Sequence, residues 1–418
     1  MAIDPEELKR RRAERQQQRQ AKQRSMVVRL IVAGIALVLC AVLIIVIVGN
    51  VKQKPGNQTT LSTEQGMAET GQTEPAQTVI RFTAAGDLNV NEAVVASGGG
   101  SYDYTNALMD VAHLLADADV TALNFEGNLY GAPYGADHSA PQTLPEALAK
   151  AGVDLVQLAN SYSIYKGMEG LKDTISGIRL AAMQPLGVYA DTAEAQSAKG
   201  YTLCTVRGVK IAFVAFTKGM DGMALPPGNE GCVNLLYTDY STDYQSVDTE
   251  GISAVLDAAA KAKPDLTVAL VHWGSEFNNT VSESQEQIRR LMQEKGVDAI
   301  IGTHSHYVQK MDFDPEAGTF VAYSLGDFLG DAQRAGSEYS VILELEITKD
   351  NESGETKITG YSYVPIFTVA EEGKPLRVVR IREAMKAYEE GYIDRVSEQT
   401  YNAMAYALER IEARIKGE

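Results

Sequence analysis

Six short apolar segments lie between residue 79 and residue 325, and each has the length of a β-strand. They are VIRFTAA, VTALNF, DLVQLA, LTVALV, VDAIIG and TFVAYSL, at residues 79–85, 120–125, 154–159, 266–271, 297–302 and 319–325. Helix-like stretches separate them, most clearly residues 282–296, which begin with a capping-box pattern at Ser282 and Gln285 and end at Gly296. Strand and helix alternating at this spacing predict an α/β (or mixed α+β) fold built in layers.

The remaining segments after residue 79 add to this pattern. Residues 198–215 are typical of a β-hairpin that turns at Arg207-Gly208, so some of the strand pairing should be antiparallel. Residues 339–368 predict further strands, and residues 376–416 are expected to be mostly helical. We therefore expect one main domain at residues 79–370, followed by a C-terminal helical extension at residues 371–418.

The N-terminal part of the chain has a different character. Residues 30–48 are nineteen apolar residues without a charge, which is long enough to span a bilayer. Residues 1–29 carry nine Lys/Arg and four Asp/Glu, and a positive flank of this kind favours the cytoplasmic side. A cleaved signal peptide fits less well, because its apolar region is shorter and ends in a small-x-small site that is missing here.

We interpret this part of the chain as a membrane anchor that holds the main domain outside the cell. The run of residues 50–78 is rich in Gln, Thr, Gly and Glu and has too few large apolar residues to fold alone. The expected order is a basic cytoplasmic tail, a single-pass transmembrane signal anchor and a flexible linker, at residues 1–25, 26–49 and 50–78.

Charge and cysteine content exclude some classes of function. The net charge is −17, and the local +5 of residues 1–29 leaves −22 for the rest of the chain. A body this acidic is not expected to bind nucleic acid, which requires a basic surface. The three cysteines are too few for a disulfide framework or a thiolate metal site, and we expect Cys204 and Cys232 to be structural thiols, although they could pair outside the cell.

Polar residues follow nearly every predicted strand. The carboxyl ends of parallel strands share one edge of a sheet, and ligands bind along that edge. In an extended segment residues i and i+2 point to the same side, so His304 and His306 are expected to reach one site together. The side chains that should converge there are Asp87, Asn89, Asn124, Glu126, Asn160, His272, Glu276, His304, His306 and Asp327.

This set of residue types is typical of a metal site. Imidazoles mixed with carboxylates and an amide oxygen suit Mn, Fe or Zn, and the set is large enough for two ions about 3.5–4 Å apart. A single Asp or Asn at a strand end is more often a turn or cap residue, so the constellation counts for more than its members. Outside it, we expect His113 to be a core histidine, His138 to be solvated and Trp273 to serve packing.

The order of the polar segments resembles a known family. The segments GDLN, NFEGN, LANS, HWGSE, IIGTHSHYVQ and YSLGDF are similar to those of CapA-type capsule-synthesis proteins over about residues 79–330. That family is linked to poly-γ-glutamate and polysaccharide capsules and is similar to calcineurin-like metallophosphoesterases. The resemblance implies a four-layer α/β/β/α sandwich, with metal ligands at Asp87, Glu126, Asn160, His272, His304 and His306.

Two positions depart from the family pattern and concern proton transfer. The third block usually reads Asn-Asn-His, and this chain has Tyr162 at the place of the histidine that phosphoesterases use as proton donor. The last block usually reads Ser-Leu-Gly-Asn-Phe, and Asp327 replaces its asparagine. We therefore expect Tyr162 or Asp327 to handle the proton if the site catalyses a reaction. An unperturbed tyrosine, with a pKa of about 10, matches neutral pH poorly.

Two functions follow from these observations. The first is an anchored extracellular protein that takes part in synthesis or export of a capsule or other cell-surface polymer, together with envelope-synthesis proteins and with a weakened metal site. The second is an active metal-dependent phosphoesterase or hydrolase that acts on a cell-envelope polymer or its precursor. The changed proton-donor position favours the first.

Overall fold

The computed structural model describes residues 76–332, 334–392 and 396–418. The predicted cytoplasmic tail and signal anchor, and all but the end of the predicted linker, lie outside these residues. Among the residues that are described, no helix has the length and apolar character needed to cross a membrane.

The larger of two sheets has eight strands and carries the first polar segments of the sequence. The strands β1, β2, β3 and β4 are parallel neighbours, whereas β12, β13 and β14 continue the sheet from β1 in antiparallel fashion. A short strand, β11, pairs in parallel with the end of β1. The order is β14 (Arg377–Arg380), β13 (Thr356–Val369), β12 (Tyr339–Asp350), β1 (Gln77–Asn89), β2 (Val120–Glu126), β3 (Leu155–Gln157) and β4 (Gln184–Leu186), with β11 at Asp327–Leu329.

The second sheet has six strands and carries the histidine segments. Its four central strands are parallel, and an antiparallel strand closes each edge. The predicted hairpin at Arg207-Gly208 is confirmed as the β5–β6 pair. The order is β5 (Tyr201–Val206), β6 (Val209–Thr217), β7 (Leu266–His272), β8 (Ala299–Thr303), β10 (Thr319–Ala322) and β9 (Met311–Asp314).

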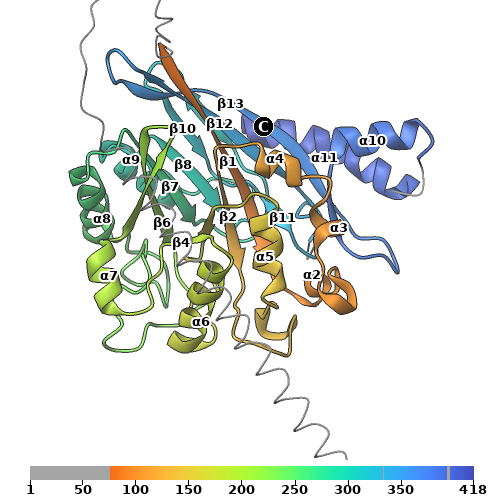
Figure 1. Cartoon of the computed structure of the whole chain (residues 1–418), viewed down its shortest axis with the longest axis horizontal. Coiled ribbons are helices and arrows are strands. Elements are labelled where there is room, and N and C mark those ends of the chain that lie inside the picture. The colour runs from red at the N-terminus through yellow and green to blue at the C-terminus, as the bar shows by residue number, and fades with distance from the viewer. Residues whose placement is uncertain (1–75, 333, 393–395) are drawn as a thin grey trace, which may run out of the picture. The chain divides into compact units, whose positions relative to one another are not determined.

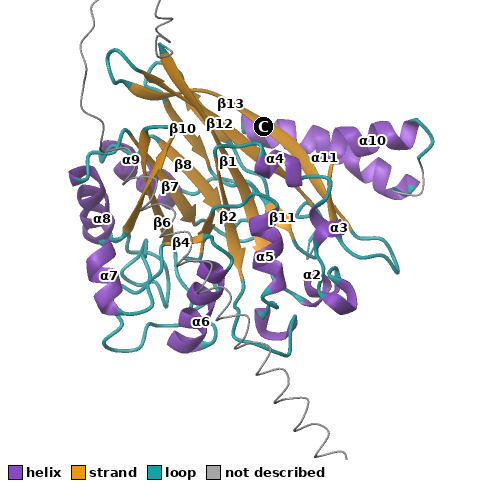
Figure 2. Cartoon of the chain, in the orientation of Figure 1, coloured by secondary structure: helices purple, strands orange, loops and turns teal. Residues whose placement is uncertain are grey.

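Helices cover the outer faces of the two sheets (Figures 1 and 2). Helix α9 has the predicted capping box, because Ser282 and Gln285 exchange side-chain and backbone hydrogen bonds. The helices are α2 (Glu92–Ala96), α3 (Thr105–Leu108), α4 (Ala112–Ala116), α5 (Thr143–Lys150), α6 (Gly167–Leu180), α7 (Thr192–Ala198), α8 (Thr249–Lys261), α9 (Glu283–Glu294), α10 (Ile381–Glu389) and α11 (Glu398–Lys416), with 3₁₀ turns at Gly99–Ser101 and Ala136–His138.

Alternation along each strand shows how the layers pack. In β6 one set of side chains joins β1 residues in the core between the sheets, namely Val209, Ile211, Phe213 and Ala215. The alternate set faces α8 and α9, namely Ala212, Val214 and Phe216. A third cluster packs the other face of β1–β3 against α5 and α6. Burial of one such large side chain contributes about 1.5–3 kcal/mol, so two buried sheet faces hold the strand ends firmly. The expected layered α/β fold with two sheets is confirmed.

A close approach of two glycines places β11 beside β1. A Cβ on Gly86 would lie 1.8 Å from the carbonyl oxygen of Gly326, so no other residue fits without moving the backbone. The amide of Asp87 donates to that same carbonyl at 3.0 Å. The glycines that precede Asp87 and Asp327 therefore allow these two carboxylates to lie side by side.

Some local expectations need correction. His113 is exposed on α4 and is not a core histidine, because the buried face of that short helix is provided by Leu115. Residues 376–416 are mostly helical as expected, but they begin with β14, which pairs with β13. Trp273 is wholly buried and donates its indole N–H to the Tyr323 carbonyl at 2.8 Å, which confirms its packing role. Cys204 and Cys232 are free thiols.

Candidate metal centre

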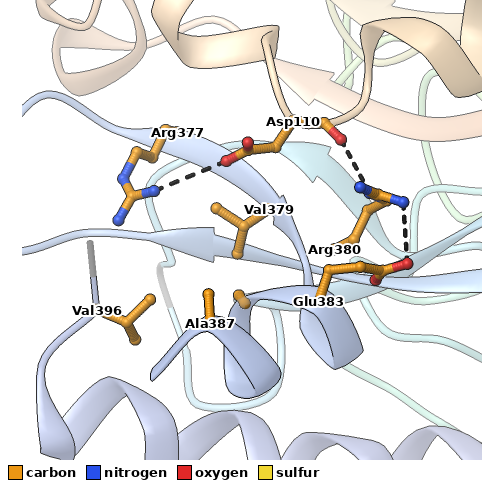
Figure 3. A pocket seen from close by; sticks show the side chains of 8 residues that line it. Asp110, Arg377, Val379, Arg380, Glu383, Ala387 and Val396 are labelled. Carbon is orange, nitrogen blue, oxygen red and sulfur yellow. Dashed lines mark hydrogen bonds and ion pairs between the residues drawn. The ribbon is translucent and has the colours of Figure 1, made fainter. Parts of the chain in front are cut away.

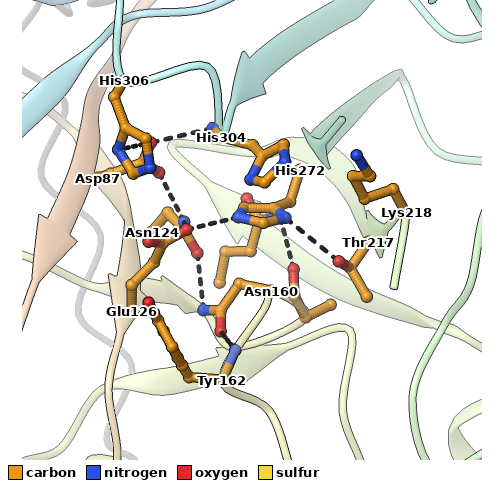
Figure 4. Close-up of polar contacts among 12 residues, drawn as sticks. Asp87, Asn124, Glu126, Asn160, Tyr162, Thr217, Lys218, His272, His304 and His306 are labelled. Carbon is orange, nitrogen blue, oxygen red and sulfur yellow. Dashed lines mark hydrogen bonds and ion pairs between the residues drawn. The ribbon is translucent and has the colours of Figure 1, made fainter. Parts of the chain in front are cut away.

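The carboxyl ends of β1, β2, β7 and β8, together with the start of β11, bring six potential ligands together. Figure 4 labels all of them except Asp327. They form two groups of three, in each of which the ligand atoms lie within 4.8 Å of one another. The first triad is Glu126, His272 and His304, and the second triad is Asp87, His306 and Asp327. All six residues are buried, which is unusual for charged groups without a partner.

Asn124, on β2, connects the two triads. Its side-chain amide donates to Asp87 Oδ1 at 2.6 Å and to Glu126 Oε1 at 3.3 Å. One carboxylate of each triad is therefore held by the same NH₂ group (Figure 4). Since Asn124 is itself held by Asn160, whose amide donates to Asn124 Oδ1 at 3.0 Å, the two triads are parts of one hydrogen-bonded unit.

The hydrogen bonds of Thr217 define the tautomer of His272. The Thr217 hydroxyl donates to the Gly219 carbonyl at 2.8 Å, so its oxygen is left to accept from His272 Nδ1, 3.2 Å away. The proton of the neutral imidazole is then on Nδ1, and the lone pair of Nε2 points at Glu126 Oε1, with which it is in close contact. Two acceptors facing each other require a proton or a cation between them, and a metal-binding histidine is commonly oriented in this way.

His304 and His306 do not lie in an extended segment, and in this respect the prediction was wrong. Both have a positive φ, 88° and 59°, a strained conformation that is rare for residues other than glycine and is found at functional sites. Their rings are 6.2 Å apart and enter different triads. The backbone N–H of His304 donates to Asp87 Oδ2 at 2.9 Å, which helps to stabilise this turn.

His304 also has an unsatisfied polar atom. Its Nδ1 is buried and has no hydrogen-bond partner among the described residues. A buried polar nitrogen without a partner costs about 1–3 kcal/mol, unless a ligand or ion meets it. Burial and the neighbouring His272 keep the pKa of His304 well below its usual value, so the ring is neutral and able to act as a ligand.

Burial and neighbouring charges shift the pKa values of the other candidate ligands. Burial, with the adjacent carboxylates, raises the pKa of Asp87 and of Glu126 to about 7. Burial also lowers the pKa of His272 to about 3. Burial opposes charge on His306 too, but Asp327, whose Oδ1 lies 2.8 Å from His306 Nδ1, raises the pKa of that imidazole to about 10. Two of the three carboxyls, Asp87 and Glu126, thus have pKa values near neutral pH. Such raised pKa values indicate a cluster that lacks positive charge.

Asn160 and Tyr162 lie next to the triads. The Asn160 side-chain oxygen accepts from the Tyr162 backbone N–H at 3.0 Å, while its amide group is bonded to Asn124, so its role as a metal ligand stays a prediction. Tyr162 stacks on His138, with ring centroids 3.8 Å apart. His138 is half-buried rather than solvated, and its Nδ1 lies 3.0 Å from the Val90 carbonyl oxygen. Burial, together with the nearby Glu126, raises the pKa of the Tyr162 phenol, so this group stays protonated.

Sequence reasoning missed two residues, Thr217 and Lys218. They follow the apolar segment of β6 just as the other polar residues follow their strands, so the same signal was present in the sequence. A cavity of about 250 Å³ lies beside the first triad, and its lining includes both Lys218 and His304. Glu276, which was expected near the site, lines the same cavity.

A second cavity, of about 110 Å³, contains none of the triad residues (Figure 3). Its two arginines already have partners: Arg377 is 3.7 Å from a carboxylate oxygen of Asp110, and Arg380 is 2.9 Å from Glu383. The charges of these two arginines are therefore matched within the protein.

The fold and the paired triads define a two-sheet α/β protein with a candidate dinuclear metal centre. A family model described as bacterial capsule synthesis protein PGA_cap matches residues 81–332, and the chain belongs to this family. The matched range begins in β1 and ends just after β11, so it includes all six triad residues.

Two capsule proteins are similar to this chain in sequence, and one solved structure can be aligned with it. The PGA biosynthesis protein CapA of Bacillus subtilis (strain 168) is 27% identical over 202 residues, which are 48% of each chain. The capsule biosynthesis protein CapA of Bacillus anthracis is 28% identical over 202 residues, 48% of this chain and 46% of the relative. The match thus spans about half the length of these relatives. The calcineurin-like phosphoesterase YfkN from Bacillus subtilis aligns with a TM-score of 0.43 at 16% identity, over 79% of this chain and 99% of that one.

Proposed function

We propose that this chain takes part in the synthesis or export of a bacterial capsule or cell-surface polymer, poly-γ-glutamate or a polysaccharide. Its membership of the capsule synthesis family supports this role, as do the roles named for the two similar CapA proteins. As part of the proposal, the apolar run at residues 30–48 anchors the chain in the cell membrane with the main domain outside, where the polymer and the envelope-synthesis proteins are its partners.

The proposal includes a divalent metal centre in the two triads. The observation that carries it is the lone pair of His272 Nε2, which points at Glu126 Oε1 because Thr217 fixes the opposite nitrogen as the donor. The unpaired His304 Nδ1 supports it. Three imidazoles and three carboxylates fit Mn, Fe or Zn, and a bound ion would supply Lewis-acid stabilisation to an oxygen of the substrate.

Within this site the residues of the chain have separate tasks. Glu126, His272 and His304 would hold one ion, and Asp87, His306 and Asp327 a second. Asn124 and Asn160 keep the carboxylates of both triads in place. The raised pKa of Tyr162 makes its phenol a weak general acid at neutral pH, although the phenol can still donate a hydrogen bond. Polymer binding without turnover is therefore favoured over rapid hydrolysis.

The second candidate is metal-dependent hydrolysis of a phosphoester in an envelope polymer or its precursor. One observation favours it: the cavity of about 250 Å³ gives a substrate access to His304 and hence to the first triad. Tyr162, or Asp327 through its contact with His306, would then move the proton.

The deciding experiment measures how many metal ions are bound per full chain, after the chain has been purified without chelator or affinity tag. One to two equivalents of Mn, Fe or Zn in the wild type, lost in the His304→Ala/His306→Ala double variant, would support the metal centre. A folded wild type without metal would overturn it. Turnover of phosphoesters that stops with chelator and in the double variant would select hydrolysis, whereas polymer binding without turnover would select the accessory role.

A further inference from the structure

Lys218 is held beside the first triad by its backbone. It directly follows β6, and its backbone N–H donates to the carbonyl of His272 at 2.8 Å. The preceding residue, Thr217, contacts the ring of the same histidine. Lys218 is therefore tied to His272, a candidate metal ligand, by its own backbone N–H and by the side chain of the residue before it.

Among the described residues the ammonium of Lys218 forms no ion pair, and Glu276 acts on it only at longer range. Its Nζ donates to the Gly274 carbonyl at 2.8 Å and lies 4.5 Å from the centre of the Tyr244 ring. No carboxylate of the described residues is within the 4.0 Å of an ion pair. An ammonium has three donors, and the hydrogen bond to Gly274 uses one of them. The side chain is half-buried, so this charge lacks part of its hydration as well.

Lys218 and His304 line the same cavity of about 250 Å³. The other lining residues are Ser161, Gly219, Asp221, Tyr244, Ser275 and Glu276, so Lys218 is the one Lys or Arg of this lining. Its positive charge therefore faces space that a ligand can enter, next to an imidazole that belongs to the first triad.

Lys210 shows what a purely structural lysine looks like on the same strand. It lies near the other end of β6, and its Nζ donates to the carbonyls of Ala262 and Lys263 at 3.2 and 3.3 Å. These carbonyls end helix α8, where a positive charge is favourable on its own account. Lys218 has a single carbonyl partner and lines a cavity, and a structural role does not explain that difference.

We infer that Lys218 recognises one anionic group of the substrate, a phosphate or a carboxylate, that lies in this cavity against the first triad. The inference rests on the proposed function and names the class of substrate. Asp221 and Glu276 line the same cavity and would repel a second negative charge. The cavity thus admits one anionic group at a time next to Lys218.

Calorimetric titration of the full, metal-loaded chain with inorganic phosphate, and separately with acetate, tests this inference. Lys218→Met should weaken binding of the preferred anion roughly ten- to hundred-fold, because a hydrogen bond to a charged group is lost. Lys218→Arg should retain most of the affinity, and Lys210→Met should bind as the wild type does. Phosphate and acetate distinguish a phosphate group from a carboxylate group as the ligand.

Metal content, measured on the same samples, separates this inference from the metal centre. Equal anion binding by the wild type and Lys218→Met, or binding of neither anion by the wild type, would overturn the role of Lys218 while a normal metal content left the centre intact. A Lys218→Met chain that loses metal in parallel with the anion would also overturn it, because the lysine would then support the ligands. A wild type without metal would contradict the proposed metal centre itself.

Discussion

Asp87 and Asp327 lie directly opposite each other in the parallel pair formed by β1 and β11. Both carboxylates are buried, and His306 Nδ1 lies 2.8 Å from Asp327 and 3.9 Å from Asp87. Two buried like charges at neighbouring positions repel each other, and either a proton on one carboxyl or a cation beside both relieves this repulsion. In the metal-free chain the imidazolium of His306 serves as that cation, which explains its high pKa.

Asp327→Asn should lower the pKa of His306 from about 10 toward its ordinary value of 6.5, because one of the two facing negative charges is removed. The substitution restores the asparagine that the capsule synthesis family usually carries at this position, so the fold should persist. NMR titration of the histidine rings in the metal-free chain measures this shift. An unchanged pKa for His306 would show that Asp327 does not govern its charge.

Thr217→Val should weaken metal binding about 10- to 100-fold, since the acceptor that fixes the His272 tautomer is lost. The volume of the side chain changes little. The matched control is Thr267→Val, a buried threonine at the other end of β7, which should bind metal as the wild type does. Competition with a metal indicator provides the affinities, and equal values for both variants would refute the role of Thr217.

Removal of metal should destabilise the chain. A ligand that binds only the folded state at 100 times its dissociation constant adds about 2.7 kcal/mol to the free energy of unfolding. Chelator should therefore lower the melting temperature of the wild type and leave the His304→Ala/His306→Ala variant unchanged. His113→Ala, which changes an exposed histidine, should respond as the wild type does. Scanning calorimetry measures the melting temperatures of all three chains. A wild-type melting temperature that does not change with chelator argues against a bound ion.

Glu371→Gln should destabilise the domain at neutral pH and have little effect near pH 2. Glu371 accepts from Lys374 Nζ at 2.7 Å and from the backbone N–H of Ser397 at 2.8 Å, which ties the end of β13 to the start of α11. Burial opposes its charge, but these hydrogen bonds outweigh burial and lower the pKa of Glu371 from 4.5 to about 2.

Because the folded-state pKa of Glu371 is lowered, its contribution is fully present above about pH 4.5 and is lost as the pH falls toward 2. We expect a difference of about 1–3 kcal/mol in the free energy of unfolding at pH 7. Urea unfolding of both chains at several pH values measures it, with the exposed neighbour in Glu372→Gln as control. A difference that does not vary with pH would contradict the charge-based explanation.

The sequence predicted the strands and most of the polar residues at their ends because both depend on local pattern. Apolar segments of strand length are visible in the sequence, and polar residues that follow them meet at one edge of a sheet. The Ser282–Gln285 capping box was predictable for the same reason. The C-terminal strand β14 was missed because four residues within a largely helical segment give little signal.

The grouping of the ligands could not be predicted, because it depends on contacts between residues far apart in the chain. Asp327 reaches Asp87 because Gly86 and Gly326 let two backbones approach closely, and a linear pattern does not encode that approach. The positive φ of His304 and His306 sends their rings to different triads, whereas regular strand geometry would have sent them to one.

Trp273 is the only tryptophan of the chain, and it is wholly buried next to His272, with its indole ring stacked 5.9 Å from Tyr323. All indole fluorescence of the protein therefore originates within one residue of a candidate metal ligand. A paramagnetic ion such as Mn²⁺ in the first triad should quench this emission, and Zn²⁺ in the same place should not. The fold thus contains an intrinsic optical reporter that can follow occupancy of its own centre without any label.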